Sequence, residues 1–113
     1  MMTPLRKTLL LALLPASALA DVLIDVRTPG EYNAGHLDNA ILLPVQEIGD
    51  NIAAVAPDHD ETIYLYCRSG ARADAARDIL REQGYRQVIN LGSMGAARDW
   101  LQAHPEVTLR AVE

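Results

Sequence analysis

Segment 62–84 constrains the fold of this chain most, because it changes from the period of a strand to the period of a helix within a few residues. The alternating run Thr62–Tyr66 predicts a buried strand, and the apolar spacing from Ala73 to Gln83 predicts a helix that ends near Gly84. The loop Cys67–Arg72 joins the two elements. Such a junction is typical of α/β domains, in which a strand delivers a short loop to the start of a helix.

The rest of the chain repeats this alternation. Further strands are expected at Val22–Val26, Ala40–Leu43 and Gln87–Leu91, and helices from Pro29 to Gly35, over Glu47–Val55 and over Ala96–His104, with a turn at Gly92–Gly95 before the last helix. A capping box of Thr28 and Glu31 should begin the first of these helices. Strands that alternate with helices pair in parallel, so the expected fold class is α/β, with a central parallel sheet and helices on both faces.

The N-terminal residues have the three parts of a secretory signal peptide. Arg6 and Lys7 precede the apolar run Leu9–Leu14, and small residues follow up to Ala20. The apolar run is well short of the roughly 20 residues that cross a bilayer, so no stable membrane span is expected. We therefore predict that residues 1–20 are a signal peptide, cleaved after export.

Cleavage would leave residues 21–113, which are enough for one compact domain but not for two. This part carries eight arginines against fifteen acidic residues, a formal charge of −7. That charge argues against nonspecific binding to nucleic acid or to an anionic membrane surface.

Cys67 is the only cysteine of the chain and lies where a thiol can be activated. Unpaired N–H groups and the positive end of a helix both favour the thiolate, and the same cradle binds anions. A lone cysteine is more often an inert core residue, but the flanking loop favours the reactive interpretation. One cysteine allows no internal disulfide. Since no cluster of His, Cys or carboxylate has metal-ligand spacing, no metal and no other cofactor is expected.

Three ordered blocks of the sequence resemble the rhodanese domain. They are Leu23–Tyr32, Gly35–Ala40 with the nearby Pro44, and Cys67–Arg72. With the export signal, the chain is similar to the periplasmic thiosulfate sulfurtransferases of the phage-shock type. The resemblance implies a periplasmic rhodanese domain over residues 21–113. It also implies a thiosulfate sulfurtransferase that moves sulfur, through a persulfide on Cys67, to cyanide or a small thiol, with a dithiol protein as a further candidate acceptor.

Roles within the loop follow from the residues and from this resemblance together. Cys67 is the expected catalytic residue. We expect Arg72 to bind the sulfonate end of thiosulfate, because its planar fork lies in the first turn of the helix. The remaining candidates for substrate binding are Arg68, through its charge or as a gate, and Ser69, Gly70 and Ala71, through their backbone N–H groups.

Two other functions share these residue types. A cysteine phosphatase or arsenate reductase also combines a cysteine, a loop of N–H donors and a closing arginine. Its loop resembles Cys-x5-Arg, whereas four residues separate Cys67 from Arg72 here, which makes a smaller cradle. The second alternative is a noncatalytic domain that carries persulfide or binds a partner, and it differs from the enzyme only in turnover.

Several polar residues near the expected site are predicted to be structural. Asp25 and Arg27 should pair with the loop backbone or with Glu31, and His36 should be a hydrogen-bonded core histidine. Trp100 shows no platform spacing, so packing is its expected role.

Overall fold

The structure, a computed structural model, describes residues 20–112, so residues 1–19 of the expected signal peptide lie outside the described residues. The elements in chain order are β1 (Val22–Asp25), α2 (Pro29–Ala34), β2 (Ala40–Leu42), α3 (Ile48–Val55), β3 (Thr62–Cys67), α4 (Ala71–Glu82), β4 (Gln87–Ser93) and α5 (Met94–Ala103). No helix within this part of the chain is both long enough and apolar enough to span a membrane.

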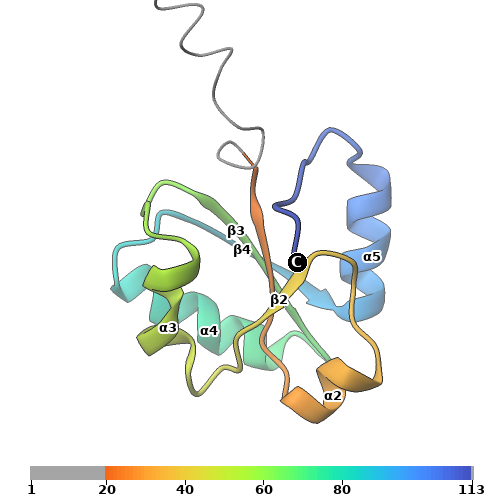
Figure 1. The fold of residues 1–113 in the computed structure, drawn as a ribbon, viewed down its shortest axis with the longest axis horizontal. Helices are drawn as coiled ribbons and strands as arrows, with labels where there is room; N and C mark the ends of the chain where they lie inside the picture. Colours follow the sequence, from red (N-terminus) through yellow and green to blue (C-terminus); the bar gives the residue numbers. More distant parts are fainter. Residues whose placement is uncertain (1–19, 113) are drawn as a thin grey trace, which may run out of the picture.

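The four strands form one sheet in the order β2-β1-β3-β4, and all neighbouring pairs are parallel. Helices α3 and α4 lie on one side of the sheet and α5 lies on the other, while α2 lies at the end where β1 and β3 finish (Figure 1). The expected α/β class, with a central parallel sheet and helices on both faces, is confirmed.

The alternation in β3 explains why both faces of the sheet are covered. Ile63, Leu65 and Cys67 belong to one apolar cluster with buried residues of α3 and α4. Tyr64 and Tyr66 belong to a second cluster with residues of α5. All five side chains are buried, so β3 is a central strand that must be apolar on both sides.

Helix α2 begins with the expected capping box. The Thr28 hydroxyl accepts from the N–H of Glu31 at 3.2 Å, and the Glu31 carboxylate accepts from the N–H of Thr28 at 3.1 Å. Pro29 is the first helical residue and Gly35 ends the helix. Because the box fixes Glu31 in the first turn, its carboxylate is held at the carboxyl edge of the sheet.

The predicted turn at Gly92–Gly95 is wrong, because β4 continues to Ser93 and α5 begins directly at Met94. Ser93 is the N-cap, and its hydroxyl accepts from the N–H of Ala96 at 3.1 Å. A bulge precedes this junction, since Leu65 pairs with Asn90 but Cys67 pairs with Ser93. Gly92 lies in the bulge with φ +93°, a conformation that suits glycine.

Candidate active site

Cys67 is the last residue of β3, at the carboxyl edge of the sheet, and the loop after it curls back over the sulfur. The side chain of Cys67 is fully buried, and the N–H of Gly70 donates to its Sγ at 2.8 Å. Helix α4 begins one residue later, at Ala71. The thiol therefore lies at the amino end of a 12-residue helix, where donor groups and the helix dipole favour negative charge on sulfur.

The loop can close on the sulfur because Gly70 adopts a left-handed conformation, with φ +96°. A Cβ at this position would lie 3.4 Å from the Cα of Gly92, so the bulge of β4 and the cysteine loop approach each other closely. Both residues have a positive φ where the two segments meet, so glycine is favoured at Gly70 in the loop and at Gly92 in the bulge. This explains why the loop contains a glycine three residues after Cys67.

Asn90 joins the bulge to the loop, and it was not among the site residues expected from the sequence. Its Oδ1 accepts from the N–H of Gly92 at 2.7 Å. Its Nδ2 donates to the carbonyl of Gly70 at 2.9 Å and to Asp74 Oδ1 at 2.8 Å. Asn90 thus fixes the residue that donates to the sulfur. The only sequence signal was an asparagine two residues before a glycine, a pattern that indicates a local side-chain turn.

Arg72 lies in the first turn of α4, as expected, but its guanidinium pairs with Glu31. Nη1 is 2.7 Å from Oε1 and Nη2 is 3.0 Å from Oε2, so both arms of the fork are used. The hydrogen bonds from Arg72, followed by that from the Thr28 backbone, lower the pKa of Glu31 to about 2. The same pair raises the pKa of Arg72. The ion pair ties α2 to α4 beside the loop.

Arg68 is the charged side chain of the loop that has no partner within residues 20–112. Its side chain is exposed and forms no hydrogen bond or ion pair with any residue of the described range 20–112. It borders a cavity of about 400 Å³ together with α2 and the start of α5, where Gly35, Ser93 and Met94 contribute. Cys67 is not among the lining residues, because its sulfur is buried beneath the loop. Ser69 and Ala71 are exposed on the same loop.

Asp25 and Arg27 pair with each other beneath this cavity. Arg27 Nη2 lies 2.7 Å from Asp25 Oδ2 and also donates to the carbonyl of Gly35 at 2.7 Å. The hydroxyl of Tyr66 donates to Asp25 at 2.8 Å and accepts from the N–H of Leu37 at 3.1 Å. Burial raises the pKa of Tyr66, which keeps this hydroxyl protonated. The structural role expected for Asp25 and Arg27 matches these contacts, although their partner is not Glu31.

His36 is not a core residue, which corrects the expectation from the sequence. It is exposed, its ring stacks on Tyr32 with centroids 3.6 Å apart, and its Nδ1 lies 2.8 Å from the carbonyl of Tyr32. The short helix α2 ends at Gly35, so the chain turns outward before Leu37 enters the core. Trp100 packs against Tyr64, as expected, with ring centroids 5.2 Å apart. Within residues 20–112, no group of three or more His, Cys, Asp or Glu could hold a metal ion.

A parallel four-stranded sheet with a cysteine loop between a central strand and a helix defines a small α/β domain, and the loop places a thiol where the start of a helix favours negative charge. Comparison with known proteins identifies this class. The Rhodanese-like domain family matches residues 8–100, and the chain belongs to this family.

Two relatives are sulfurtransferases. The chain is 40% identical over 71 residues to the thiosulfate sulfurtransferase PspE of Escherichia coli, a match that covers 63% of this chain and 68% of that protein. It is 40% identical over 70 residues to a sulfurtransferase of Allochromatium vinosum, which covers 62% of this chain and 64% of that protein. The second match spans less than two thirds of the relative's length.

Solved structures give the same result. A rhodanese with anions from E. coli superimposes with a TM-score of 0.66 and 38% identity, and the match covers 68% of this chain and 91% of that one. The human single domain sulfurtransferase TSTD1 superimposes with a TM-score of 0.59 and 26% identity, covering 88% and 91% of the two chains. Sulfur transfer is therefore the chemistry that the relatives share.

Proposed function

We propose that this protein is a thiosulfate sulfurtransferase that carries sulfur as a persulfide on Cys67. The observation that supports this most directly is the N–H of Gly70, which donates to the Cys67 sulfur at 2.8 Å at the start of α4. A donor in this position stabilises a thiolate before attack and after the sulfur has left again. The thiosulfate sulfurtransferase activity of the E. coli relative supports the choice of donor.

In the first half of the reaction, the Cys67 thiolate attacks the outer sulfur of thiosulfate. A bond forms between Sγ and that sulfur, the sulfur–sulfur bond of thiosulfate breaks, and its electron pair leaves with sulfite. The product is a persulfide anion on Cys67. Because Sγ is buried, this proposal requires the exposed Arg68–Ser69 part of the loop to move outward and admit the donor.

The two arginines of the loop have different roles in this proposal. Arg68 binds the sulfonate, since its guanidinium borders the cavity and pairs with no residue in the described range. Arg72 holds the loop against α2 through Glu31 and contributes its positive charge. The backbone N–H groups of Ser69, Gly70 and Ala71 complete the cradle for the transferred sulfur.

In the second half of the reaction, a thiophilic acceptor attacks the outer sulfur of the persulfide. The new bond forms between the acceptor and that sulfur, the bond to Sγ breaks, and the electron pair returns to Cys67 as thiolate. Cyanide gives thiocyanate, and a thiolate gives a new persulfide. No metal or cofactor is needed for either half.

We further propose that the protein acts in the periplasm after cleavage behind Ala20. The first backbone pairing of the described residues supports this site, since the N–H of Asp21 donates to the carbonyl of Thr108 at 2.8 Å. After cleavage this nitrogen is the α-ammonium group of the new amino terminus, which is still a donor for the Thr108 carbonyl. N-terminal sequencing of the exported protein should begin at Asp21, whereas a chain that retains Met1 in a membrane fraction would contradict cleavage.

The main test is an intact mass measured after incubation with thiosulfate. Wild type should gain the mass of one sulfur atom, lose it again on addition of cyanide, and release sulfite and thiocyanate in equal amounts. Cys67→Ser should gain nothing while keeping the circular dichroism of the fold. A loaded protein that does not turn over would indicate a carrier. An activity toward an aryl phosphate that equals or exceeds sulfur transfer would indicate phosphatase chemistry instead.

A further inference from the structure

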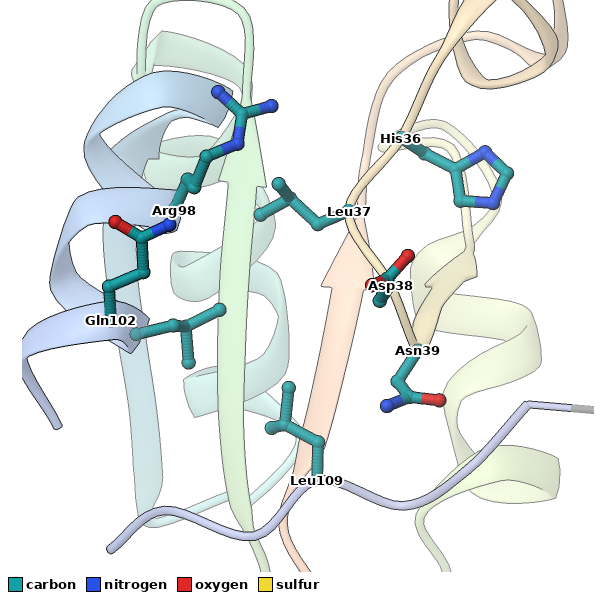
Figure 2. Close-up of a pocket in the computed structure, with 8 residues that line it drawn as sticks. His36, Leu37, Asp38, Asn39, Arg98, Gln102 and Leu109 are labelled. Atoms are coloured by element: carbon teal, nitrogen blue, oxygen red, sulfur yellow. The ribbon is translucent and has the colours of Figure 1, made fainter. Parts of the chain in front are cut away.

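A second cavity lies next to the active-site cavity and has a volume of about 500 Å³. Its walls are residues 36–39, between α2 and β2, and the exposed side of α5, where Arg98 and Gln102 contribute (Figure 2). Its apolar lining consists of three leucines: Leu37 between α2 and β2, Leu101 of α5, and Leu109 of the C-terminal segment. An enclosure of this size holds several side-chain groups, far more than cyanide occupies.

The two cavities have no lining residue in common, but their lining segments follow one another along the chain on both sides. Ala34 and Gly35 line the active-site cavity, and residues 36–39 continue the same wall. The other wall is helix α5. Its Gly95 lines the active-site cavity, and Arg98, about one helical turn further along α5, lines the second cavity. We call the combined feature the α5 groove. In Figure 2 the strands run upward to their carboxyl ends, with Arg98 at the upper end of the groove and Leu109 at the lower end.

The groove has an apolar floor and a polar rim. Leu37, Leu101 and Leu109 form the floor, and the side chains of Asp38 and Arg98 come from opposite walls. Neither Asp38 nor Arg98 makes a side-chain hydrogen bond or ion pair with any residue from 20 to 112. Their unused donors and acceptors suit the carbonyls and N–H groups of a bound peptide, and the leucines suit one apolar side chain.

The distribution of arginines points to the same groove. Residues 20–112 contain eight arginines, and six of them form an ion pair with a carboxylate or donate to a backbone carbonyl of that range. The other two are Arg68 and Arg98, and each lines one of the two cavities. The two arginines without a partner in the described residues therefore both line the α5 groove, Arg68 at the cysteine loop and Arg98 on α5.

We infer that the α5 groove binds a polypeptide segment that carries the acceptor thiol. This inference rests on the proposed sulfur transfer and names its acceptor class. The cysteine thiolate of the segment attacks the outer sulfur of the Cys67 persulfide and leaves as a peptide persulfide, and the electron pair of the broken bond returns to Sγ. The rest of the segment lies along α5.

The length of the groove fixes the spacing that such a segment needs. Gly95 and Gln102 are seven residues apart on α5, which corresponds to about 10 Å along the helix at 1.5 Å per residue. An extended peptide covers about 3.3 Å per residue. With its cysteine beside Gly95, at the end of the groove next to the cysteine loop, such a peptide brings an apolar side chain three positions away to the leucine floor.

Four N-acetylated peptide amides test this spacing with the full-length protein and thiosulfate as donor. Two of them, Cys-Gly-Gly-Leu and Leu-Gly-Gly-Cys, present the leucine in the two chain directions. Cys-Gly-Gly-Gly and Gly-Gly-Gly-Cys are their matched controls. We expect kcat/KM for one leucine peptide to exceed that for its glycine control about tenfold or more, as burial of one leucine side chain implies. A ratio near one in both directions would overturn the inference.

Two substitutions on α5 place this preference in the groove. Gln102→Trp fills the groove and should bring the leucine-to-glycine ratio close to one. Asp99→Trp introduces the same ring at an exposed position of the same helix that does not line either cavity, and it should keep the wild-type ratio. A preference that survives Gln102→Trp would place the leucine elsewhere and overturn the inference.

Two further measurements distinguish failure of the proposed sulfur transfer from failure of the groove inference: the reaction with cyanide and a binding titration. If thiosulfate does not load Cys67 and no thiocyanate forms, the proposed function fails. The groove is then still tested by an NMR titration with the serine analogues of the four peptides. One of the two leucine analogues should shift the methyl signals of Leu101 and Leu109, and its glycine control should not. Equal shifts, or none, would overturn the groove assignment.

Discussion

Arg72 gives both arms of its guanidinium to Glu31, at 2.7 and 3.0 Å, although 41 positions separate the two residues. The carboxylate that closes the capping box of α2 therefore also holds the first turn of α4. Arg68, by contrast, borders the cavity with no partner in residues 20–112. This difference divides the charged residues of the loop into one that supports it and one that can meet an anion.

The first prediction tests the supporting role of Arg72. Arg72→Ala and Glu31→Gln should each lower kcat/KM for thiosulfate about two- to tenfold, and the double variant should lose no more than the worse single variant. The losses are expected not to add because both changes break one pair. Direct binding of sulfonate by Arg72 would give a different result, in which Arg72→Ala is severe and Glu31→Gln retains or gains activity. Arg86→Ala, which breaks an exposed pair with Asp60, is the control.

The second prediction concerns Arg68. Arg68→Ala should lower kcat/KM for thiosulfate about ten- to hundredfold, because one charged hydrogen bond to the donor is lost. The effect should appear mainly in KM, and it should add to that of Glu31→Gln, since the two residues belong to different contacts. An Arg68→Ala variant with an unchanged KM would remove Arg68 from the donor site.

The third prediction is a pH dependence of stability. The pKa of Glu31 is lowered from 4.5 to about 2 in the folded protein, chiefly by Arg72. A lowered pKa means that the pair stabilises the fold above the unfolded value, and that this stability is lost as the pH falls from about 4.5 toward 2. The urea midpoint of wild type should fall over this range, and that of Glu31→Gln should fall less. Asp99→Asn, an exposed carboxylate of α5, should follow wild type.

The sequence predicted most of the strands and helices, because the spacing of apolar residues follows the face of each element that is buried. The strands around Ile24 and Leu65, the cap at Thr28 and the position of Cys67 at the carboxyl end of a strand were all expected. Periodicity carried no information on the pairing of Arg72 with Glu31. That ion pair joins α2 to α4, so it depends on how the two helices are placed relative to each other in the folded protein.

The junction of β4 with α5 shows what local patterns missed. Gly92 and Gly95 suggested a turn, but the bulge absorbs Gly92 within the strand, and Ser93 caps the helix at once. The side chain of Asn90 accepts from Gly92 within this bulge and donates to Gly70, a contact across 20 positions of the chain that a local pattern does not contain. The exposed His36 was missed for a similar reason, since α2 is too short to return it to the core.

The fourth prediction concerns the backbone of the loop. Gly70→Ala should lower the free energy of unfolding by about 1–2 kcal/mol, since an L side chain at φ +96° is strained and its Cβ would lie against the Cα of Gly92. Gly30→Ala is the control, because the new Cβ would meet nothing closer than 4.0 Å within a helix. Chemical denaturation should show Gly30→Ala to be as stable as wild type or more stable. Equal effects of the two changes would contradict a constrained loop.

The last prediction assigns a positioning role to Asn90. Asn90→Asp keeps an acceptor for the N–H of Gly92 but loses the donor to the Gly70 carbonyl and places a carboxylate beside Asp74. Loss of that donor should slow alkylation of Cys67 by iodoacetamide at neutral pH about two- to tenfold, because the Gly70 N–H is no longer held on the sulfur. Asn51→Asp, on the exposed side of α3, should have no effect.

The alkylation rate separates positioning from general stability. If Asn90 only stabilises the fold, Asn90→Asp should lower the urea midpoint and leave the rate unchanged or raise it, because a loosened loop exposes Cys67. A lower rate in a protein that is still fully folded shows that the surroundings of the sulfur have changed, and not only the stability of the fold. The same variant should then lower kcat for thiosulfate more than it alters KM, since in the proposed mechanism Asn90 acts through the Cys67 sulfur, whereas the donor anion is assigned to Arg68.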